Sequence, residues 1–259
     1  MTKRVAIVTG VSRLKGIGRA ICIALAKQGH DIFFTYYQVY DEQMEWGADE
    51  NAVEAITAEL KNIGVSCASL EIDLTSDRAA DTVMNKAIST LGPVSILVNN
   101  ATYSTASQIL TIETSNLDQH YAVNIKANVL LTQAFIKNFK TGSHGRIINM
   151  SSGQALSPMH HEIAYAMTKS AIDTLTVTLS STLAAKGITI NSVNPGPTDT
   201  GWMTDDLEKV LKSASPPGRI GRPEDTARLI AFLVSEDAAW ITGQVIHSEG
   251  GFDRYKNWG

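Results

Sequence analysis

The sequence is poor in cysteine. Two cysteines occur in 259 residues, Cys22 and Cys67, and both lie in apolar segments without the spacing of a metal or redox motif. Metal centres and disulfide frameworks need several such residues at characteristic intervals. We therefore expect two free thiols in a reducing cytosol and no metal site.

Long apolar runs are also missing. The first one extends only from Val5 to Val8 before Thr9-Gly10, and a signal peptide needs a longer stretch and a small-residue cleavage site. No segment approaches the length of a transmembrane helix. These absences predict a cytoplasmic protein that does not bind membranes.

Excess positive charge is absent as well. The formal net charge is −4 and the pI is about 5.9, with no run rich in Lys or Arg, so nothing supports nucleic-acid binding. The hydrophobic fraction of 44% is that of an ordinary globular protein. No linker or repeat divides the chain, which favours a single domain over residues 1–259.

Short β-branched runs alternate with longer helical patterns almost to the end of the chain. We expect strands at 4–9, 31–36, 66–72, 95–100, 146–151, 188–193 and 243–248. Helices are expected near 17–28, 50–62, 77–91, 114–139, 163–186 and 223–235. This rhythm predicts an α/β fold, a doubly wound parallel sheet of about seven strands with helices on both faces.

Two stretches interrupt the rhythm. Residues 37–50 are acidic and aromatic, and longer than an ordinary connection between a strand and a helix. Residues 196–222 are rich in proline and are expected to form a loop over the substrate, with one short helix at 204–212.

A glycine-rich loop follows the first expected strand. Gly10, Gly16 and Gly18 lie between that strand and an amphipathic helix, in TGVSRLKGIG. Glycines there let backbone N–H groups approach a pyrophosphate, and the helix N-terminus favours its negative charge. The loop predicts nucleotide binding, with a bare turn as the alternative.

This loop resembles that of the short-chain dehydrogenase/reductase family, whose first turn reads TGxxxGxG. Here five residues instead of three separate Gly10 from Gly16, so an extra pair lies within Val11–Lys15. The longer spacing is similar to the enoyl-reductase branch, whereas Gly16-Ile17-Gly18 matches the ketoreductase branch. The resemblance implies a Rossmann-like fold and a nicotinamide cofactor.

The choice of cofactor depends on the end of the second strand. NAD-using relatives place an acidic residue there, but this chain has Tyr36, so repulsion of a 2′-phosphate is missing. Arg13 and Lys15 offer positive charge, as in NADP-preferring relatives, although Asp41 and Glu42 follow nearby. NADP(H) is therefore favoured over NAD(H).

The resemblance implies further cofactor contacts. Asp73 matches the family's adenine-binding aspartate, with a helix cap as the alternative, and Leu74 follows it. Asn99-Asn100-Ala101 matches the family's NNAG, but Thr102 replaces the glycine. The PGxxxT segment over the nicotinamide is represented by Pro195, Gly196, Thr198 and Thr200, with Ile188 a weaker candidate that could belong to the core.

Tyr165 and Lys169 lie four residues apart, which places both on one face of a helix. Reduction of a ketone leaves charge on oxygen, and a phenol near a cation can hand that oxygen a proton. By resemblance both residues also contact the cofactor. Ser152 matches the family's serine thirteen residues earlier, and Ser151 is a weaker alternative. Asn124 matches its asparagine, with Asn128 as a rival.

The complete set Asn124, Ser152, Tyr165 and Lys169 implies an NADPH-dependent carbonyl reductase similar to 3-oxoacyl-(acyl-carrier-protein) reductases. The expected substrate is a small carbonyl compound or an acyl thioester. Alternatives are an alcohol or sugar dehydrogenase running toward oxidation, or a non-catalytic nucleotide sensor. Family members are commonly homotetramers, and we expect small residues at 174–181 to support self-association.

Overall fold

The computed structural model describes residues 4–140 and 144–255. Within them, seven strands form one parallel sheet in the order β3-β2-β1-β4-β5-β6-β7. The strands are β1 (Val5–Val8), β2 (Asp31–Tyr36), β3 (Cys67–Glu71), β4 (Val94–Asn99), β5 (Gly145–Met150), β6 (Ile188–Asn194) and β7 (Val245–His247). The predicted doubly wound α/β sheet is confirmed.

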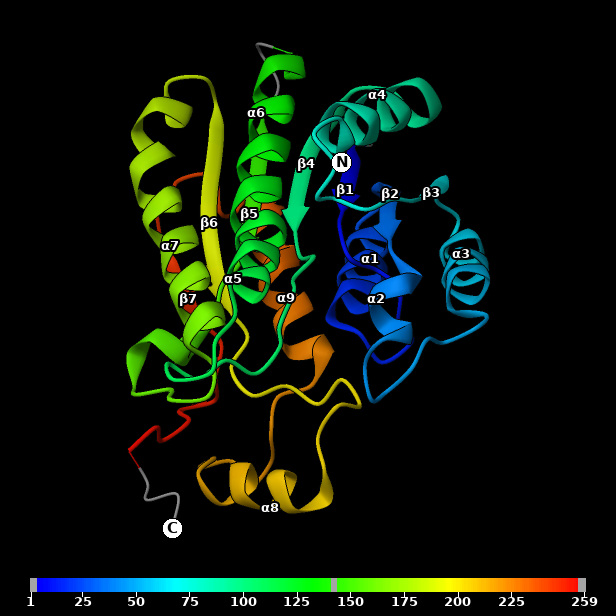
Figure 1. Ribbon diagram of the computed structural model, residues 1–259. Helices are drawn as coiled ribbons and strands as arrows, with labels where there is room; N and C mark the ends of the chain where they lie inside the picture. The colour runs from blue at the N-terminus through cyan, green and yellow to red at the C-terminus, as the bar shows by residue number, and fades with distance from the viewer. Residues whose placement is uncertain (1–3, 141–143, 256–259) are drawn as a thin grey trace.

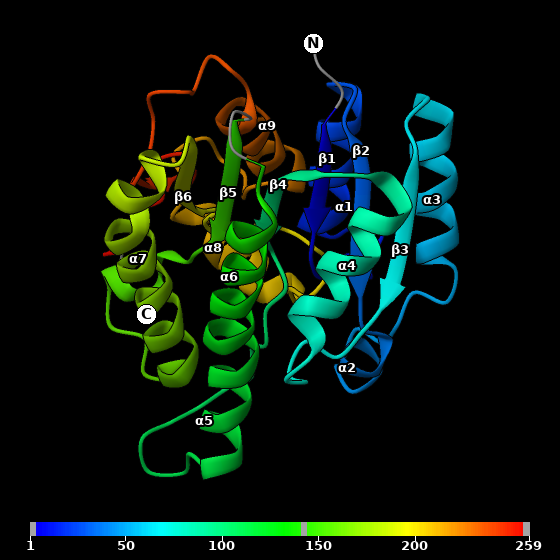
Figure 2. The ribbon, with the colours of Figure 1, turned by 90° about the horizontal axis from the view of Figure 1, so that it is seen from above.

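Helices cover both faces of this sheet (Figures 1 and 2). One face carries α1 (Ile17–Lys27), α3 (Ala52–Ile63) and α9 (Pro223–Val234). The other carries α4 (Ala79–Leu91), α6 (Asn128–Asn138) and α7 (Ile163–Ala184). Shorter elements lie at the carboxyl end of the sheet: α2 (Gln38–Glu42), α5 (Thr114–His120), the 3-10 helix η2 (Gly153–Leu156) and α8 (Asp205–Ser213). In the described residues, no helix is long and apolar enough to cross a membrane.

The central strands are buried on both faces, as their nearly continuous apolar runs predict. Ile7 faces α4 and α6, whereas Ala6 and Val8 face α1 and α9. Because neighbouring residues of a strand point to opposite faces, each strand contributes to two core clusters. The sheet is therefore a rigid support for the loops at its carboxyl end.

The helix expected at 114–139 is in fact three segments. A π-helix, η1 (Tyr121–Ala127), separates α5 from α6. A π-turn holds one more residue than an α-turn and is frequent at functional sites. Asn124 lies inside η1 and is 3% exposed, which apolar periodicity alone does not predict.

Residues 37–50, which interrupt the predicted rhythm, include the short helix α2. One other expectation needs adjustment. On α7, Thr176 does not belong to the small-residue surface, since it is fully buried and hydrogen-bonds Asn149 and Ser192 of the sheet. Thr174 and Thr178 are exposed on the opposite side of the helix.

Candidate active site

The predicted site residues gather at the carboxyl edge of the sheet, where α8 also lies (Figure 1). β1 is flanked by β2 and β4, so the order of strands reverses between β1 and β4. Open parallel sheets bind ligands at such a reversal. Tyr36 ends β2, and the residues that follow the other strands there are Gly10, Asp73, Asn100, Ser152 and Gly196.

The glycine loop is packed too tightly for larger residues. Gly10 has a φ of +71°, and a Cβ there would lie 2.6 Å from the Cα of Ala101. A Cβ on Gly18 would lie 2.8 Å from the carbonyl oxygen of Gly10. The first turn of α1, which is fully described and includes Ile17, holds no acidic residue. Its N-terminus therefore remains available to an anion.

Thr9 ties this loop to the end of β4. Its hydroxyl oxygen accepts the backbone N–H groups of Asn100 and Ala101, both at 3.0 Å. In return, the Asn100 amide donates to the carbonyl oxygens of Thr9 and Gly10, at 2.8 and 2.9 Å. Asn100 and Ala101 thus position the glycine loop from the neighbouring strand.

The two-residue insertion in the loop meets segment 37–50. The Arg13 guanidinium lies 4.8 Å from the centre of the Trp46 ring and donates to the carbonyl oxygen of Thr200 at 2.7 Å. The N–H of Leu14 donates to Asp49 Oδ2 at 2.9 Å. The exposed Lys15 also lies near this junction, because a Cβ on Gly201 would be 3.4 Å from its side chain. Three loops distant in sequence meet here.

The predicted adenosine side contains Tyr36, Asp73 and Leu74. Tyr36 ends β2 and pairs with Glu71 of β3. Asp73 Oδ1 accepts the N–H of Thr75 at 2.8 Å and so closes a turn after β3. It does not cap the following helix, because the N-cap residue of α4 is Arg78. Both Asp73 and Leu74 are half-buried just after β3, on the edge that holds the glycine loop.

Tyr165 and Lys169 lie one turn apart near the start of α7. Lys169 Nζ is 5.5 Å from the centre of the Tyr165 ring and donates to the carbonyl oxygen of Met150 at 2.9 Å. Burial lowers the pKa of Lys169 to about 8, although the Asp173 carboxylate partly offsets this. A buried amine tends to lose its charge because the ammonium is poorly solvated.

Burial raises the pKa of Tyr165 to about 12, and the nearby charge of Glu162 adds to the effect. Hydrogen bonds with the Thr102 and Ser152 hydroxyls act in the opposite direction. The sequence favours a phenolate stabilised by Lys169, whereas burial keeps this phenol protonated in the chain alone. The Tyr165 proton is thus held until an acceptor reaches it.

Ser152 and Asn124 complete the predicted set. Ser152 Oγ accepts the N–H of Gln154 at 3.3 Å, which leaves its own proton free to be donated toward the phenol. Asn124 Nδ2 donates to Thr168 Oγ1 at 3.0 Å, and Thr168 donates to the carbonyl oxygen of Tyr165 at 2.9 Å. Asn124 is therefore linked through Thr168 to the backbone of Tyr165, while Ser152 lowers the pKa of the Tyr165 phenol.

The loop after β6 is held by short-range hydrogen bonds. Gly196 has a φ of +65°, and its N–H donates to Asn194 Oδ1 at 2.9 Å. Thr198 is 5% exposed and donates to the carbonyl oxygen of Gly196 at 3.1 Å. Ile188 is at the opposite end of β6, fully buried in the core beside Gly145. Of the two alternatives for Ile188, the core one is correct.

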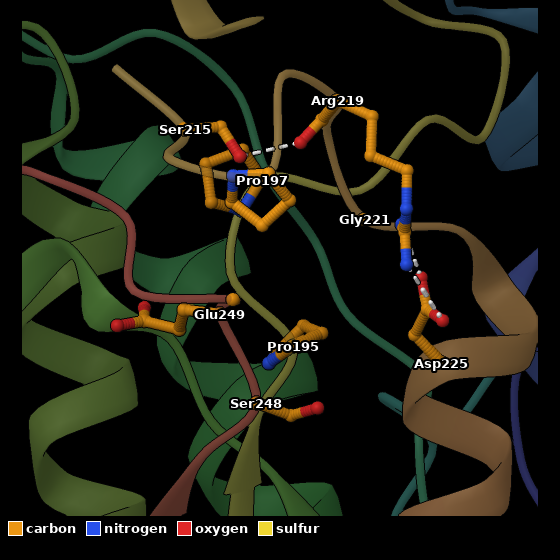
Figure 3. A pocket seen from close by; sticks show the side chains of 10 residues that line it. Pro195, Pro197, Ser215, Arg219, Gly221, Asp225, Ser248 and Glu249 are labelled. Atoms are coloured by element: carbon orange, nitrogen blue, oxygen red, sulfur yellow. Dashed lines mark hydrogen bonds and ion pairs between the residues drawn. The ribbon is translucent and has the colours of Figure 1, made fainter.

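A cavity of about 300 Å³ opens next to this loop, under residues 215–221 (Figure 3). Its lining includes Pro195, Pro197, Ser215, Arg219, Asp225 and Glu249. None of the four predicted catalytic residues, all of which are described, lines it. The cavity is therefore lined by residues of the predicted substrate loop and does not include the Tyr165 phenol.

Several site residues escape sequence reasoning. Ser107 accepts the N–H of Ala164 at 3.0 Å and so anchors the start of α7 before Tyr165. Tyr40 hydrogen-bonds Ser104, and its ring lies 5.5 Å from that of Tyr103 at a tilted angle, which brings segment 37–50 over the end of β4. The unusual length of that segment was the available signal. For Ser107, no motif marks the residue.

Comparison with known proteins agrees with this geometry. A family described as enoyl-(acyl carrier protein) reductase matches residues 10–253. An uncharacterized oxidoreductase of Bacillus subtilis is 48% identical over 97% of this chain and 98% of its own. The 3-oxoacyl-[acyl-carrier-protein] reductase of Aquifex aeolicus is 31% identical over 96% of both chains. A blue fluorescent protein from a metagenomic library, solved with NADPH, is 33% identical, with a TM-score of 0.86 over 96% of this chain and 97% of its own.

The chain belongs to the short-chain dehydrogenase/reductase family, and it is an NAD(P)-dependent oxidoreductase that acts on a small molecule. Within residues 4–140 and 144–255, no group of three or more His, Cys, Asp or Glu side chains is arranged to hold a metal ion.

Proposed function

We propose that this protein reduces a carbonyl group to an alcohol with NADPH, and that Tyr165 donates the proton. The observation that carries the proposal is the meeting of Tyr165 with Lys169 and Ser152 at the carboxyl edge of the sheet. A hydroxyl donor, a phenol and a cation close together are what a carbonyl oxygen needs as it gains charge.

The glycine loop and its neighbours fit a dinucleotide. Gly10 and Gly18 leave no room for side chains, and the first turn of α1 is free of acids. The loop and helix N-terminus would hold the pyrophosphate, with Asp73 and Leu74 on the adenine side and Pro195, Gly196, Thr198 and Thr200 on the nicotinamide side. When bound, NADPH supplies the hydride.

The chain's own residues carry out the proton transfer. Ser152 donates a hydrogen bond to the carbonyl oxygen, and Tyr165 transfers its phenolic proton to that oxygen. Lys169, when protonated, stabilises the resulting phenolate. Asn124 fixes the turn of α7 that carries Tyr165, through Thr168.

The preference for NADPH is supported by residue type. Tyr36 does not repel a 2′-phosphate, and Arg13 and Lys15 bring positive charge to the same edge. Burial raises the pKa of the Tyr36 phenol, and the nearby carboxylates of Glu71 and Glu54 raise it further. The positive charges of Arg13 and Lys15 would offset these carboxylates. The engagement of Arg13 with Trp46 and Thr200 leaves part of its guanidinium fork for phosphate.

A 3-oxoacyl thioester is the proposed substrate, because the Aquifex aeolicus relative is named for reduction of such a group. Residues 196–222 would cover it. The test is steady-state oxidation of NADPH, and in parallel NADH, with an acetoacetyl thioester. Turnover with NADPH and much less with NADH is expected.

The Tyr165→Phe variant is the matched control. It should bind NADPH as the wild type does, measured by nucleotide fluorescence, and lose nearly all turnover. A wild type that binds NADPH and turns over no thioester, simple ketone, sugar or steroid in either direction would contradict reduction and favour a sensor. Turnover restricted to alcohols with NADP⁺ or NAD⁺ would favour the dehydrogenase alternative.

Two further proposals concern assembly and compartment. The family commonly forms homotetramers, and α7 exposes Thr174, Val177 and Thr178 for such contacts. A sizing column tests this, and a monomer at micromolar concentration contradicts it. A cytoplasmic location is supported by Cys22 and Cys67, both of which are free thiols.

A further inference from the structure

The segment 248–255, which follows β7, turns back over two loops of the candidate site. The N–H of Ser248 donates to the carbonyl oxygen of Asn194 at 2.8 Å, at the end of β6. Further on, the hydroxyl of Tyr255 donates to the carbonyl oxygen of Leu156 at 3.2 Å. Leu156 ends η2, the 3-10 helix that begins directly after the predicted catalytic serine. This segment therefore joins the loop after β6 to the loop after β5.

Glu249 is the residue of this segment that binds the loop after β6. Asn194 Oδ1 accepts the N–H of Gly196 at 2.9 Å, and Asn194 Nδ2 donates to Glu249 Oε1 at 2.5 Å. Gly196 and Glu249 are also closely packed, because a Cβ on Gly196 would lie 3.0 Å from the Glu249 Cβ. The Glu249 carboxylate points away from the ion pair of Arg219 and Asp225 in the same cavity (Figure 3). Through Asn194, it holds the turn at Gly196 in place.

Arg254 brings the opposite charge to the same place. It forms an ion pair with Glu249, and the side chains of Arg254 and Glu249 are only 13% and 11% exposed. Both lie against Gly153, the buried residue after Ser152, because a Cβ on Gly153 would be 2.5 Å from Arg254 Cζ and from Glu249 Oε1. Separating two such charges is costly, since each would be left poorly solvated. The ion pair therefore limits where the backbone of Ser152 and Gly153 can lie.

We propose that Glu249 and Arg254 are positioning residues that hold Ser152 at a fixed place relative to the turn at Gly196. The inference rests on the proposed function, in which Ser152 donates to the carbonyl oxygen and Gly196 lies on the nicotinamide side. Neither charged residue supplies a proton to the product. Their ion pair fixes the distance between the serine hydroxyl and the turn, and a displacement of about 1 Å at such a site costs on the order of a hundredfold in rate.

The first arm of the test follows the two loops without turnover, by hydrogen exchange of the intact chain. The reporters are the N–H groups of Gln154 and Gly196, each of which donates to a side-chain oxygen two residues earlier. Arg254→Gln leaves the Glu249 carboxylate buried without the guanidinium, which favours local opening. Peptides that contain Gln154 or Gly196 should exchange about tenfold faster, since a lost contact between charged groups is worth that order. Peptides from β1 should exchange as in the wild type.

Matched variants separate this ion pair from a general loss of charge. Arg228→Gln removes a guanidinium that also pairs with a carboxylate, that of Asp225, but the Arg228 side chain is 69% exposed, so exchange in both loops should not change. Arg254→Lys keeps the charge and should restore part of the protection. If Arg254→Gln does not fold, Arg254→Met combined with Glu249→Gln removes both buried charges and gives the same comparison. Wild-type exchange at both loops in Arg254→Gln, or in that double variant, would overturn the proposal, whether or not the protein reduces thioesters.

The second arm asks whether the loss of rate depends on Ser152. In the wild-type background, Arg254→Gln should lower kcat for the thioester about tenfold or more, with little change in KM for NADPH. In a Ser152→Ala background the same substitution should lower kcat less than about twofold, because no hydroxyl remains to be misplaced. Equal falls in both backgrounds would show that Arg254 only stabilises the fold, and would overturn the positioning role. A wild type without carbonyl reductase activity would contradict the proposed function, and the exchange arm would still decide whether the ion pair holds the two loops.

Discussion

The ammonium nitrogen of Lys169 donates to the carbonyl oxygen of Met150 while lying 5.5 Å from the ring of Tyr165. Lys169 is 4% exposed, so its charge has one backbone oxygen, one aromatic ring and the Asp173 carboxylate near it and little water. Burial accordingly lowers its pKa to about 8. The amine is poised to change charge close to neutral pH.

The first prediction follows from that pKa. A lysine is charged below its pKa, and the proposed reaction needs the charged form to stabilise the phenolate. Tyr165 stays protonated over the same range because its pKa is about 12. Thus kcat/KM for carbonyl reduction should be level at low pH and fall about tenfold per pH unit above about 8. A pH profile from 6 to 10 measures this.

The control for the first prediction is Lys169→Arg, because an arginine stays charged throughout that range. The Lys169→Arg variant should be less active because a guanidinium fits the lysine's place poorly, but its kcat/KM should stay level above pH 8. A wild-type profile that rises through pH 8 would contradict the assignment of the charged lysine.

The second prediction concerns Glu162, the N-cap residue of α7, which lies three residues before Tyr165. Burial raises the pKa of this carboxyl from 4.5 to about 7, and its Oε2 has no hydrogen-bond partner among the described residues. The folded chain therefore holds this proton between pH 4.5 and 7, whereas the unfolded chain releases it. The stability contributed at low pH is lost as pH rises through this window.

Replacing Glu162 with glutamine removes that ionisation. Glu162→Gln should melt near the wild-type temperature at pH 5 and a few degrees higher at pH 8. The exposed Glu45 is the matched control, and Glu45→Gln should not gain stability between these pH values. Thermal melts at both pH values decide, and a Glu162→Gln variant less stable than wild type at pH 8 would contradict the argument.

The third prediction separates two reasons why residue 10 is glycine, its positive φ and its close approach to Ala101. Both Gly10 and Gly29 have a positive φ, but a Cβ on Gly29 meets no atom of the described residues within 4 Å, whereas one on Gly10 lies 2.6 Å from backbone. Gly29→Ala should cost about 1 kcal/mol for its backbone conformation, a fall of a few degrees in Tm. Gly10→Ala should cost clearly more and weaken NADPH binding, because Ala101 must move.

Denaturant unfolding and nucleotide fluorescence measure the two effects of these glycine variants. Equal losses of stability at Gly10 and Gly29 would mean that the close approach to Ala101 is relieved easily.

Much of this site could be predicted from residue order. The βαβ rhythm places Gly10, Asn100 and Ser152 after the ends of three of the predicted strands, and parallel strands bring their carboxyl ends to one edge. The four-residue spacing of Tyr165 and Lys169 likewise needs only a helix. These features depend on local periodicity and chain direction, which a sequence carries directly.

The remainder depends on contacts between distant segments. The packing of Trp46 on Arg13, and the hydrogen bond from Thr102 to Asn124, join segments tens of residues apart, and no periodicity in the sequence marks either contact. The π-helix around Asn124 adds a residue to a turn without a marker in the sequence. Burial also reverses the expected direction of the Tyr165 pKa, since desolvation depends on what surrounds the phenol.

The last prediction distinguishes two roles for Arg13. Its guanidinium already binds the Thr200 carbonyl and lies over Trp46, so it holds three loops together. Loss of this docking would weaken NADPH and NADH alike, whereas loss of a contact to the 2′-phosphate would weaken only NADPH. We expect Arg13→Gln to raise KM for NADPH at least tenfold more than KM for NADH, since a charge-assisted phosphate contact is worth about 1.5–3 kcal/mol.

Lys15→Gln is the matched comparison, because Lys15 is exposed in the same insertion, and among the described residues it is Arg13, not Lys15, that hydrogen-bonds Thr200 and lies over Trp46. Lys15→Gln should also reduce the preference for NADPH over NADH, and it should change the KM for NADH less than Arg13→Gln does. Equal increases of KM for both nucleotides in Arg13→Gln, with Lys15→Gln silent, would assign Arg13 to loop docking alone. The preference for NADPH would then have to come from the missing acidic residue at Tyr36.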